Sequence, residues 1–511
     1  MPVQFEGREE KIRRKRRRAM TVAFHISLVG RSDLSGEIYR QIRQAILDGR
    51  LRPGERLSST RELAAALTVA RSTVTIAYES LVAEGFATSH TGAGTFVSHQ
   101  LEAKRPASKT RRSTVRAIRV RGVWETIALP IGFDRAARFD FRTGLPDASL
   151  FPHRAWRRVV ARALRSREMA TGVYENPAGI WDLRTAIARQ IGISRSVAAS
   201  PDDVIVTNGT QQALDIVARV LLGPSDVVAM EDPGYRPLKE LLKALGARVI
   251  GVPVDREGLV VEALPAEARV VYVTPSHQFP LGVAMSLSRR RALLAWAERN
   301  NAVVVEDDYD SEFRFGGRPL EPLQTIDSTG RVVYVGTFSK TLLPALRLAF
   351  MVVPPSLREA AHKAKFVTDW HTATIAQSAL AQFIDEGAFV RHIRRVSRIY
   401  SERHEMLTAE IRRNFGDYLD LVPSSTGLHI TACARGASAD HIDAIVSRAF
   451  DLGVAVDPMS RCQVDRKPPA GIILGYGAIE TARIAEGLRR LRRCFDERMS
   501  RRPNYLEHRI M

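Results

Sequence analysis

Short apolar segments rich in β-branched residues alternate with helical patterns from about residue 140 onward. Of all the features of the sequence, this alternation restricts the possible folds most strongly. The segments are Val204–Thr207, Val227–Met230, Arg269–Thr274, Ala302–Glu306, Arg331–Val335 and Leu348–Val353. Helical patterns separate most of them, for example Gln211–Leu222 and Leu287–Arg299. Continuous apolar strands joined by helices predict an α/β fold with a mostly parallel, doubly wound sheet. Ligands of such sheets bind at the carboxyl ends of the strands, so polar residues there are the first site candidates.

Three polar clusters follow these segments. Asn208-Gly209-Thr210-Gln211 precedes a helix whose first amides can bind a phosphate, although a simply capped helix would look the same. Tyr235, after the second strand, could stack on a planar ring. The run Glu306-Asp307-Asp308-Tyr309-Asp310 puts carboxylates at a buried strand end, where a protonated pyridine nitrogen is a suitable partner. A divalent metal is the alternative, but no ligand pattern accompanies the run, and we predict no metal site.

A lysine follows the next strand in the turn Gly336-Thr337-Phe338-Ser339-Lys340. Its place past a strand end, between hydroxyls and seven residues before Arg347, suits a cofactor with a carbonyl group and a phosphate. The amine would form a Schiff base, and Thr337, Ser339 and Arg347 would bind phosphate oxygens. A surface turn with an exposed lysine is the alternative, and these residues alone do not decide between the two.

Residues 34–98 have a different, largely helical pattern. A first helix is expected from Leu34 to Gly49, and Ser59-Thr60-Arg61-Glu62 matches a capping box that starts a second helix. A third helix should run from Arg71 to Glu84, followed by a hairpin around residues 90–94. Three helices and a hairpin describe a winged helix-turn-helix. The expected buried positions are Ile38, Ile42, Ala45, Ile46, Val74, Ala77, Tyr78 and Leu81.

The charge of this part of the chain agrees with DNA binding. Residues 1–125 hold 24 basic and 12 acidic side chains, a net +12 of the chain's +20, and this asymmetry suits a polyanionic partner. A small helical domain with a solvated face is the alternative, but spacing, charge and hairpin together favour double-stranded DNA. The third helix would enter the major groove, and the hairpin would contact the backbone or the minor groove. The predicted DNA contacts are Arg61, Arg71, Ser72, Thr73, Thr75, Thr91 and Gly92.

Residues 34–98 resemble the DNA-binding domain of GntR-family regulators. The resemblance rests on Ile46-x-x-Gly49-x-Leu51-x-Pro53-Gly54-x-x-Leu57-x-Ser59, Arg61-Glu62-Leu63-Ala64, Ala70-Arg71-Ser72-Thr73-Val74 and Glu84-Gly85-Phe86. Two positions depart from the family pattern. Thr68 stands where a helix-ending glycine is common, and Ala70 where a serine often precedes the arginine. Both departures affect helix caps, and we do not carry Ala70 over as a phosphate contact.

The cysteines and the hydropathy of the chain indicate in which cellular compartment the protein is found. Three widely spaced cysteines without a CxxC pattern indicate reduced thiols rather than disulfides or zinc ligands. No apolar run is long enough to span a bilayer, and no signal peptide is recognisable, so we expect a cytoplasmic, nucleoid-associated protein without a membrane partner. The predicted organisation is a basic disordered tail (1–26), a winged helix-turn-helix (27–98), a basic linker (99–138) and a large α/β domain (139–500).

Residues 140–495 resemble fold-type-I pyridoxal-phosphate enzymes of the aspartate aminotransferase kind, and the whole chain resembles the MocR subfamily of GntR regulators, which joins both domains. The motifs are residues 274–280, 306–313 and 336–340. The resemblance implies pyridoxal 5'-phosphate as cofactor, Lys340 as the Schiff-base lysine and Asp307 as partner of the pyridine nitrogen. It also implies a smaller α+β subdomain and a domain-swapped homodimer with shared sites. The other implied cofactor contacts are Tyr309 at the ring hydroxylate, Tyr235 on the ring face, Gly209, Thr210, Gln211, Thr337, Ser339 and Arg347 around the phosphate, and Tyr174 at the partner subunit's phosphate.

Two departures from the aminotransferase pattern concern the ligand. The Asn-Pro-x-Gly motif beside the ring reads Phe279-Pro280-Leu281-Gly282 here, so Gln278 or His277 would have to replace the asparagine's bond. The run at residues 471–477 lacks the usual carboxylate-binding arginine. Either the effector lacks an α-carboxylate, or another arginine supplies the contact. The candidates are Arg435, Arg461 and Arg466.

Two functions are consistent with these features. One is a transcriptional regulator whose aminotransferase-like domain senses pyridoxal phosphate, an amine or an amino acid through an aldimine, with no enzymatic function expected. The other is an active class I/II aminotransferase with a DNA-binding appendage. The missing arginine favours the regulator, and the retained Lys340 and Asp307 leave partial transamination open.

Overall fold

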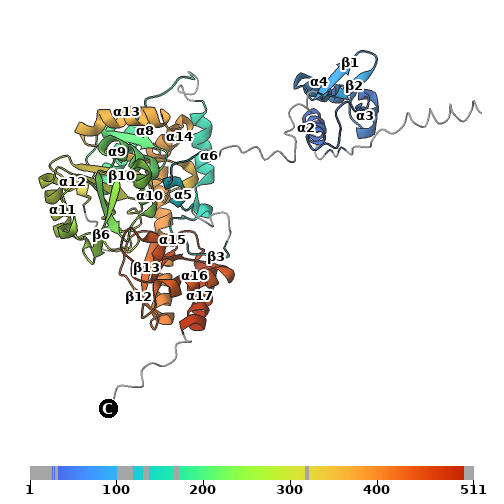
Figure 1. Cartoon of the computed structure of the whole chain (residues 1–511). Helices are drawn as coiled ribbons and strands as arrows, with labels where there is room; N and C mark the ends of the chain where they lie inside the picture. Colours follow the sequence, from blue (N-terminus) through green and yellow to red (C-terminus); the bar gives the residue numbers. More distant parts are fainter. Residues whose placement is uncertain are drawn as a thin grey trace, which may run out of the picture. The chain divides into compact units, whose positions relative to one another are not determined.

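The computed structural model describes residues 26, 28, 33–99, 119–129, 137–165, 172–316 and 321–499. The chain forms two compact units, Met1–Arg119 and Val120–Met511 (Figure 1). The predicted basic tail and most of the predicted linker lie outside the described residues. No helix in the described ranges combines the length and the apolar character needed to cross a membrane.

The first unit has the predicted three helices and hairpin. Its elements are α2 (Leu34–Leu47), α3 (Thr60–Leu67), α4 (Arg71–Ala83), β1 (Ala87–His90) and the antiparallel β2 (Gly94–Val97). The expected helix positions are all buried. The predicted capping box is present, because the Glu62 amide donates to Ser59 Oγ (3.2 Å) and the Ser59 amide donates to the Glu62 carboxylate (2.9 Å).

Both departures from the family pattern have local consequences. Thr68 ends α3 in the left-handed region (φ 56°), a conformation that glycine adopts without steric cost. Ala70 is the N-cap of α4 and makes no side-chain capping bond. The start of α4 therefore lacks the side-chain acceptor that a serine would provide.

An eight-stranded sheet forms the centre of the second unit, in the order β4-β11-β10-β9-β8-β5-β6-β7. Strands β10, β9, β8, β5 and β6 run parallel to one another, whereas β11 is antiparallel to both β10 and β4. The mostly parallel sheet is as predicted. The strands are β4 (Val204–Thr207), β5 (Val227–Asp232), β6 (Arg248–Asp255), β7 (Gly258–Leu259), β8 (Ala268–Val273), β9 (Val303–Asp308), β10 (Val332–Thr337) and β11 (Ala349–Val352).

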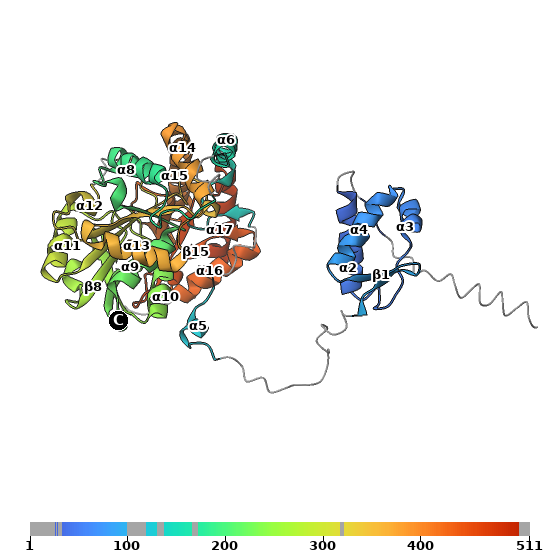
Figure 2. The same ribbon diagram turned by 90° about the horizontal axis from the view of Figure 1, so that it is seen from above.

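Helices cover both faces of this sheet (Figure 2). Helices α9 (Thr210–Leu221), α10 (Arg236–Leu245) and α13 (Arg358–Asp369) pack on one face, and α8 (Trp181–Arg195), α11 (Leu287–Arg299), α12 (Leu323–Ile326) and α14 (Thr374–Asp385) pack on the other. Side chains alternate between the two layers along each strand: Tyr272 faces the first layer and Val271 the second. Burial on both faces explains why the segments are apolar throughout.

The C-terminal residues form the expected smaller α+β subdomain. The long helix α15 (Ala388–Asn414) leads into an antiparallel sheet of order β12-β13-β16-β15, which α16 and α17 cover (Figure 1). A short parallel pair, β3 with β14, brings the segment before Gly144 against this subdomain. The remaining bounds are β3 (Phe139–Asp140), α5 (Val123–Thr126), α6 (His153–Ala163), β12 (Leu419–Leu421), β13 (His429–Ala434), α16 (Ala439–Asp451), β14 (Val454–Ala455), β15 (Asp457–Pro458), β16 (Gly471–Gly475) and α17 (Ile484–Met499).

Candidate functional site

Lys340 lies in the turn after β10, at the carboxyl end of a central strand. Its Nζ donates to the backbone oxygen of Gly144, 2.8 Å away. Gly144 has φ +78°, and a Cβ there would come within 2.9 Å of Nζ, so this position suits glycine. Burial lowers the pKa of Lys340, although the charges of Asp310 and Asp307 oppose the shift. Burial therefore shifts the protonation equilibrium of this amine toward the nucleophilic, uncharged form.

Asp307, at the end of β9, has one paired and one unpaired carboxylate oxygen. The Tyr272 hydroxyl donates to Oδ2 (2.8 Å), whereas the buried Oδ1 has no hydrogen-bond partner among the described residues. Burial raises the pKa of Asp307 to about 7, although the Tyr272 hydrogen bond acts in the opposite direction. A buried, unpaired acceptor is costly in itself and suits a pyridinium N–H. The donor set thus fits the ring of pyridoxal phosphate.

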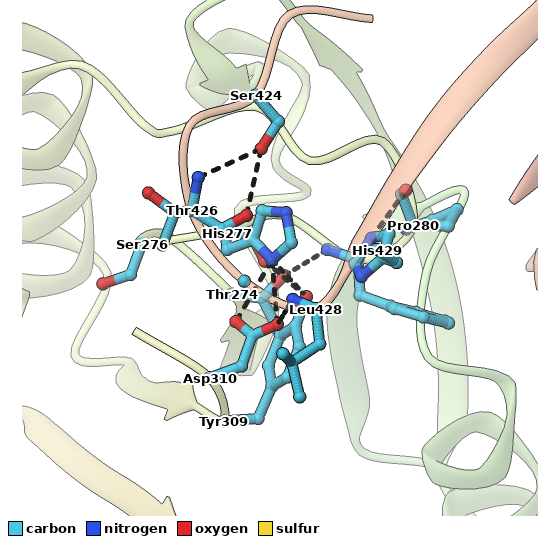
Figure 3. Close-up of polar contacts among 12 residues, drawn as sticks. Thr274, Ser276, His277, Pro280, Tyr309, Asp310, Ser424, Thr426, Leu428 and His429 are labelled. Carbon is cyan, nitrogen blue, oxygen red and sulfur yellow. Dashed lines mark hydrogen bonds and ion pairs between the residues drawn. The ribbon is translucent and has the colours of Figure 1, made fainter. Parts of the chain in front are cut away.

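Tyr309 and its neighbours form a connected polar group (Figure 3). The Tyr309 hydroxyl donates to the backbone oxygen of His277 (2.8 Å), and His277 Nδ1 lies 3.1 Å from each carboxylate oxygen of Asp310. The Leu428 amide also donates to Asp310 (3.0 Å). One donor or acceptor atom each of His277, Asp310 and His429 lies within 4.8 Å of the others. Hydrogen bonding joins His277 to Asp310, and the His429 ring lies beside that of His277, with centroids 4.4 Å apart.

Phe279 stands between the two tyrosines predicted to contact the ring. Its ring centroid is 6.3 Å from those of Tyr235 and Tyr309, edge to face in both pairs. Burial raises the pKa of Tyr235 to about 12, so its hydroxyl stays protonated. The nearby Gln278 amide is directed elsewhere: its Nε2 donates to the backbone oxygens of Pro233 (2.9 Å) and Phe279 (2.7 Å). Gln278 thereby fixes two loops, and both of its amide hydrogens have protein acceptors.

Three of the predicted phosphate-binding residues, Gly209, Thr210 and Arg347, meet at the start of α9. Gly209 (φ +82°) precedes Thr210, the first residue of that helix. The Arg347 guanidinium donates to the backbone oxygen of Asn208 (2.9 Å), and a side chain at Gly209 would collide with it. Thr337 Oγ1 accepts the Ser339 amide (3.1 Å). Helix amides, a guanidinium and hydroxyls together suit an anion.

Two predicted cofactor contacts lie apart from this group. Gln211 Nε2 donates to the backbone oxygen of Pro237 (3.2 Å), which ties α9 to the first turn of α10. Tyr174 is 71% exposed and stacks on Trp370, with ring centroids 4.3 Å apart. A role for Tyr174 at a partner subunit's site stays a prediction.

Several site residues escaped the sequence interpretation. Tyr272 sits inside an apolar strand and resembled an ordinary core residue. Gly144 gives no signal, because its contact with Lys340 joins residues 196 positions apart. His429 comes from the C-terminal subdomain, where it donates from Nε2 to the backbone oxygen of Pro280 (3.1 Å). Burial lowers the pKa of His429 to about 3, so its ring is neutral.

The predicted DNA-contacting residues lie on the exposed side of the first unit. Arg61, Arg71, Ser72 and the hairpin residues Thr91 and Gly92 are all exposed, and Thr73 and Thr75 are partly so. Arg71 Nε donates to Thr60 Oγ1 (3.3 Å), so the starts of α3 and α4 are linked. Thr75 Oγ1 donates to the backbone oxygen of Arg71 (3.0 Å), which occupies its hydroxyl hydrogen.

Comparison with known proteins identifies two families in the chain. Residues 34–97 match the gntR family of bacterial regulatory proteins, and residues 145–467 match aminotransferase class I and II. The probable rhizopine catabolism regulatory protein MocR of Rhizobium meliloti is 38% identical over 90% of this chain and 93% of its own length. The HTH-type transcriptional regulator TauR of Rhodobacter capsulatus is 35% identical over 92% of this chain and 98% of its own.

A solved structure supports the cofactor assignment. LysN, an α-aminoadipate aminotransferase from Thermus thermophilus in complex with N-(5'-phosphopyridoxyl)-L-leucine, has a TM-score of 0.65 and 30% identity. The similarity covers 71% of this chain and 93% of LysN. Together with the donor set around Lys340 and Asp307, it assigns pyridoxal phosphate to this fold.

Proposed function

We propose a means of control for this chain, which belongs to the MocR-type regulators of the gntR family. As a member of that family, it is a pyridoxal-phosphate-dependent, DNA-binding transcriptional regulator. Its aminotransferase-like domain senses pyridoxal phosphate or an amine that reaches it. The cofactor supplies an aldehyde that condenses with amines and a ring that withdraws electrons. The observation that carries the proposal is that one site combines two features. The pKa of the Lys340 amine is lowered by burial, and the buried Oδ1 of Asp307 has no hydrogen-bond partner among the described residues.

Each residue of the site has a role in this proposal. Lys340 holds the aldehyde, and Asp307 keeps a proton on the ring nitrogen. Tyr235 stacks on the ring, and Tyr309 redirects its hydroxyl hydrogen from the His277 backbone oxygen to the ring oxygen. The proposed phosphate ligands are Gly209, Thr210, Thr337, Ser339, Arg347 and the backbone amide of Gln211, whose side chain bonds Pro237 instead.

Sensing rather than turnover is supported by the strand that lies where aminotransferases place a carboxylate-binding arginine. Strand β16 is fully buried and contains no arginine. Ile473 on it packs with Met459 and Cys462. Two of the three alternative arginines are engaged at the surface, because Arg435 pairs with Asp420, and Arg461 with Asp457 (3.1 Å). Arg466 is the remaining candidate for a carboxylate contact. We propose that the domain binds its effector without rapid turnover.

A homodimer with shared sites is part of the proposal. Tyr174, Trp370 and Phe366 form a continuous aromatic surface, with Trp370 4.8 Å from Phe366 between ring centroids. The flanking Val173 and Val367 are 64% and 75% exposed. An exposed apolar surface of this kind suits a second copy of the chain. Tyr174 would then reach the partner's phosphate.

The decisive experiment compares binding with turnover. Candidate amines and amino acids are titrated against the absorbance of the cofactor, with the gene's own upstream DNA present. A sensor gives a spectral change that stalls after one equivalent and alters DNA affinity; by linkage, DNA then alters effector affinity by the same factor. Sustained turnover of an amino acid with a keto acid, without any effect on DNA binding, contradicts the proposal and establishes the aminotransferase alternative.

A further inference from the structure

Helix α10 joins the candidate cofactor site to the segment that leads toward the DNA-binding unit. Its N-cap is Tyr235, the proposed ring-stacking residue, and its second residue, Pro237, accepts the Gln211 side chain from α9. Its last turn lies about 15 Å away, since ten helical residues rise about 1.5 Å each. The cofactor-site residue and the far attachment therefore belong to one continuous hydrogen-bonded helix.

The far end of α10 carries an attachment. Arg121 NH2 donates to the backbone oxygen of Ala244 (2.9 Å), one of the carbonyls left without a helical partner at a helix C-terminus. A cation at this end is also favoured by the helix dipole. Figures 1 and 2 both show α5 beside α10. Arg121 lies just before α5 and within the predicted linker.

This attachment is weak enough to open. Helix α5 has four residues, far fewer than the roughly 12–15 that an isolated helix needs for stability in water. Val120 just before it and Trp124 within it are 61% and 57% exposed, and Val123 and Ile127 are only half-buried. None of the apolar side chains of this segment is fully buried, so apolar packing holds it weakly. Among residues 119–129, Arg121 makes the one described side-chain hydrogen bond to the rest of the second unit. The segment can therefore exist docked or released.

The middle of α10 is held by the C-terminal subdomain. Lys239 Nζ donates to the backbone oxygen of Val464, and the Val464 amide donates to Asp232 (3.0 Å) just before Tyr235. The contact at Lys239 thus forms a pivot between Tyr235 at the start of α10 and the Arg121 contact in its last turn.

We propose that α10 transmits the state of the cofactor site to the DNA-binding unit, and that Arg121 is the residue that fastens the linker to it. The inference rests on the proposed function. Occupancy of the cofactor site fixes Tyr235 and keeps the end of α10 in place for Arg121, so the linker is docked. Loss of the cofactor frees Tyr235, and the linker is released.

The test uses the full-length protein with pyridoxal phosphate bound or removed. Amide hydrogen exchange is measured for residues 120–127, and affinity for the gene's upstream DNA is measured in both states. In the wild type, we expect the cofactor to slow exchange in this segment and to change DNA affinity roughly fivefold or more. In Arg121→Ala, exchange is fast in both states and the two affinities converge, while the cofactor absorbance is unchanged. Arg121→Lys keeps a cation at the helix end and restores part of the difference.

Arg119→Ala is the matched control, because Arg119 makes no polar contact with a described residue, and it should behave as the wild type. An Arg121→Ala protein that keeps the wild-type difference in DNA affinity overturns the inference and leaves the proposed function standing. A wild type that binds the cofactor but shows the same DNA affinity with and without it overturns both.

Discussion

The Tyr272 hydroxyl lies 2.8 Å from Oδ2 of Asp307 and leaves Oδ1 of the same buried carboxylate unpaired among the described residues. The tyrosine restricts rotation of the carboxylate. The unpaired oxygen is then oriented for a donor without further rearrangement. A pre-oriented acceptor binds a ring N–H at less cost than a mobile one.

Asp307→Asn should remove a pH-dependent penalty from the cofactor-free protein. Burial raises the pKa of Asp307 from 3.8 to about 7. The folded state therefore binds the proton more tightly than the unfolded state, and stability is full below pH 3.8 and falls as pH rises toward 7. At about 1.4 kcal/mol per pKa unit, the loss at pH 8 is at most about 4 kcal/mol. Urea unfolding between about pH 5 and 8 should show a steeper decline for the wild type than for Asp307→Asn; equal slopes contradict the assignment.

Lys340→Ala should abolish the visible absorbance of the lysine-bound cofactor. The substitution removes a partly buried amine and its bond to Gly144, and the strands around it remain packed. Absorbance after addition of pyridoxal phosphate measures the effect, and circular dichroism checks the fold. Lys363→Ala is the control, since Lys363 forms an exposed pair with Glu359. Unchanged absorbance in Lys340→Ala would remove this residue from its role.

Arg71→Ala should weaken binding to specific DNA by roughly 1–3 kcal/mol if the guanidinium reads a base edge. Arg71 is exposed at the start of α4, and Thr60 orients it. Fluorescence anisotropy with the upstream fragment and with random DNA measures both affinities. An equal loss on the two DNAs reassigns Arg71 to a phosphate.

Ser59→Ala should loosen the start of α3 by about 1 kcal/mol, because one side of the capping box disappears. Amide exchange of residues 60–63 in the full-length protein should accelerate roughly fivefold, because a loss of about 1 kcal/mol raises the population of the open state by that factor. Ser59→Asp supplies another acceptor and should restore protection. Exchange that is unaffected by either change would show that packing, not the cap, holds this turn.

Tyr174→Ala should weaken both dimerisation and cofactor retention, whereas Tyr174→Phe should keep the stacking on Trp370 and lose only the hydroxyl. Sedimentation velocity measures the first property and cofactor release on dilution the second. A dimer and a cofactor affinity that are both unchanged in Tyr174→Ala would exclude this surface as the shared interface.

The sequence predicts secondary structure best where local surroundings alone determine which residue types occur. The central strands are buried on both faces, so each is a continuous apolar run, and the Ser59–Glu62 cap depends on neighbours three positions apart. Strand β6 is missed because Gly251 and Pro253 interrupt its apolar pattern. Contacts between distant segments are harder still. Nothing near Gly144 signals Lys340, and His429 approaches His277 only after the C-terminal subdomain packs on the sheet.

The reversed direction of β11 has one further consequence. Because β11 is antiparallel to β10, the chain leaves the sheet after Thr337 and re-enters it at Ala349 at the same end of the strands. Lys340 and Arg347, the proposed residues for the aldehyde and the phosphate of the ligand, therefore lie on the same connection between β10 and β11. One connection between two strands thus sets the spacing of both side chains, and adding or deleting a residue within it should displace them relative to each other.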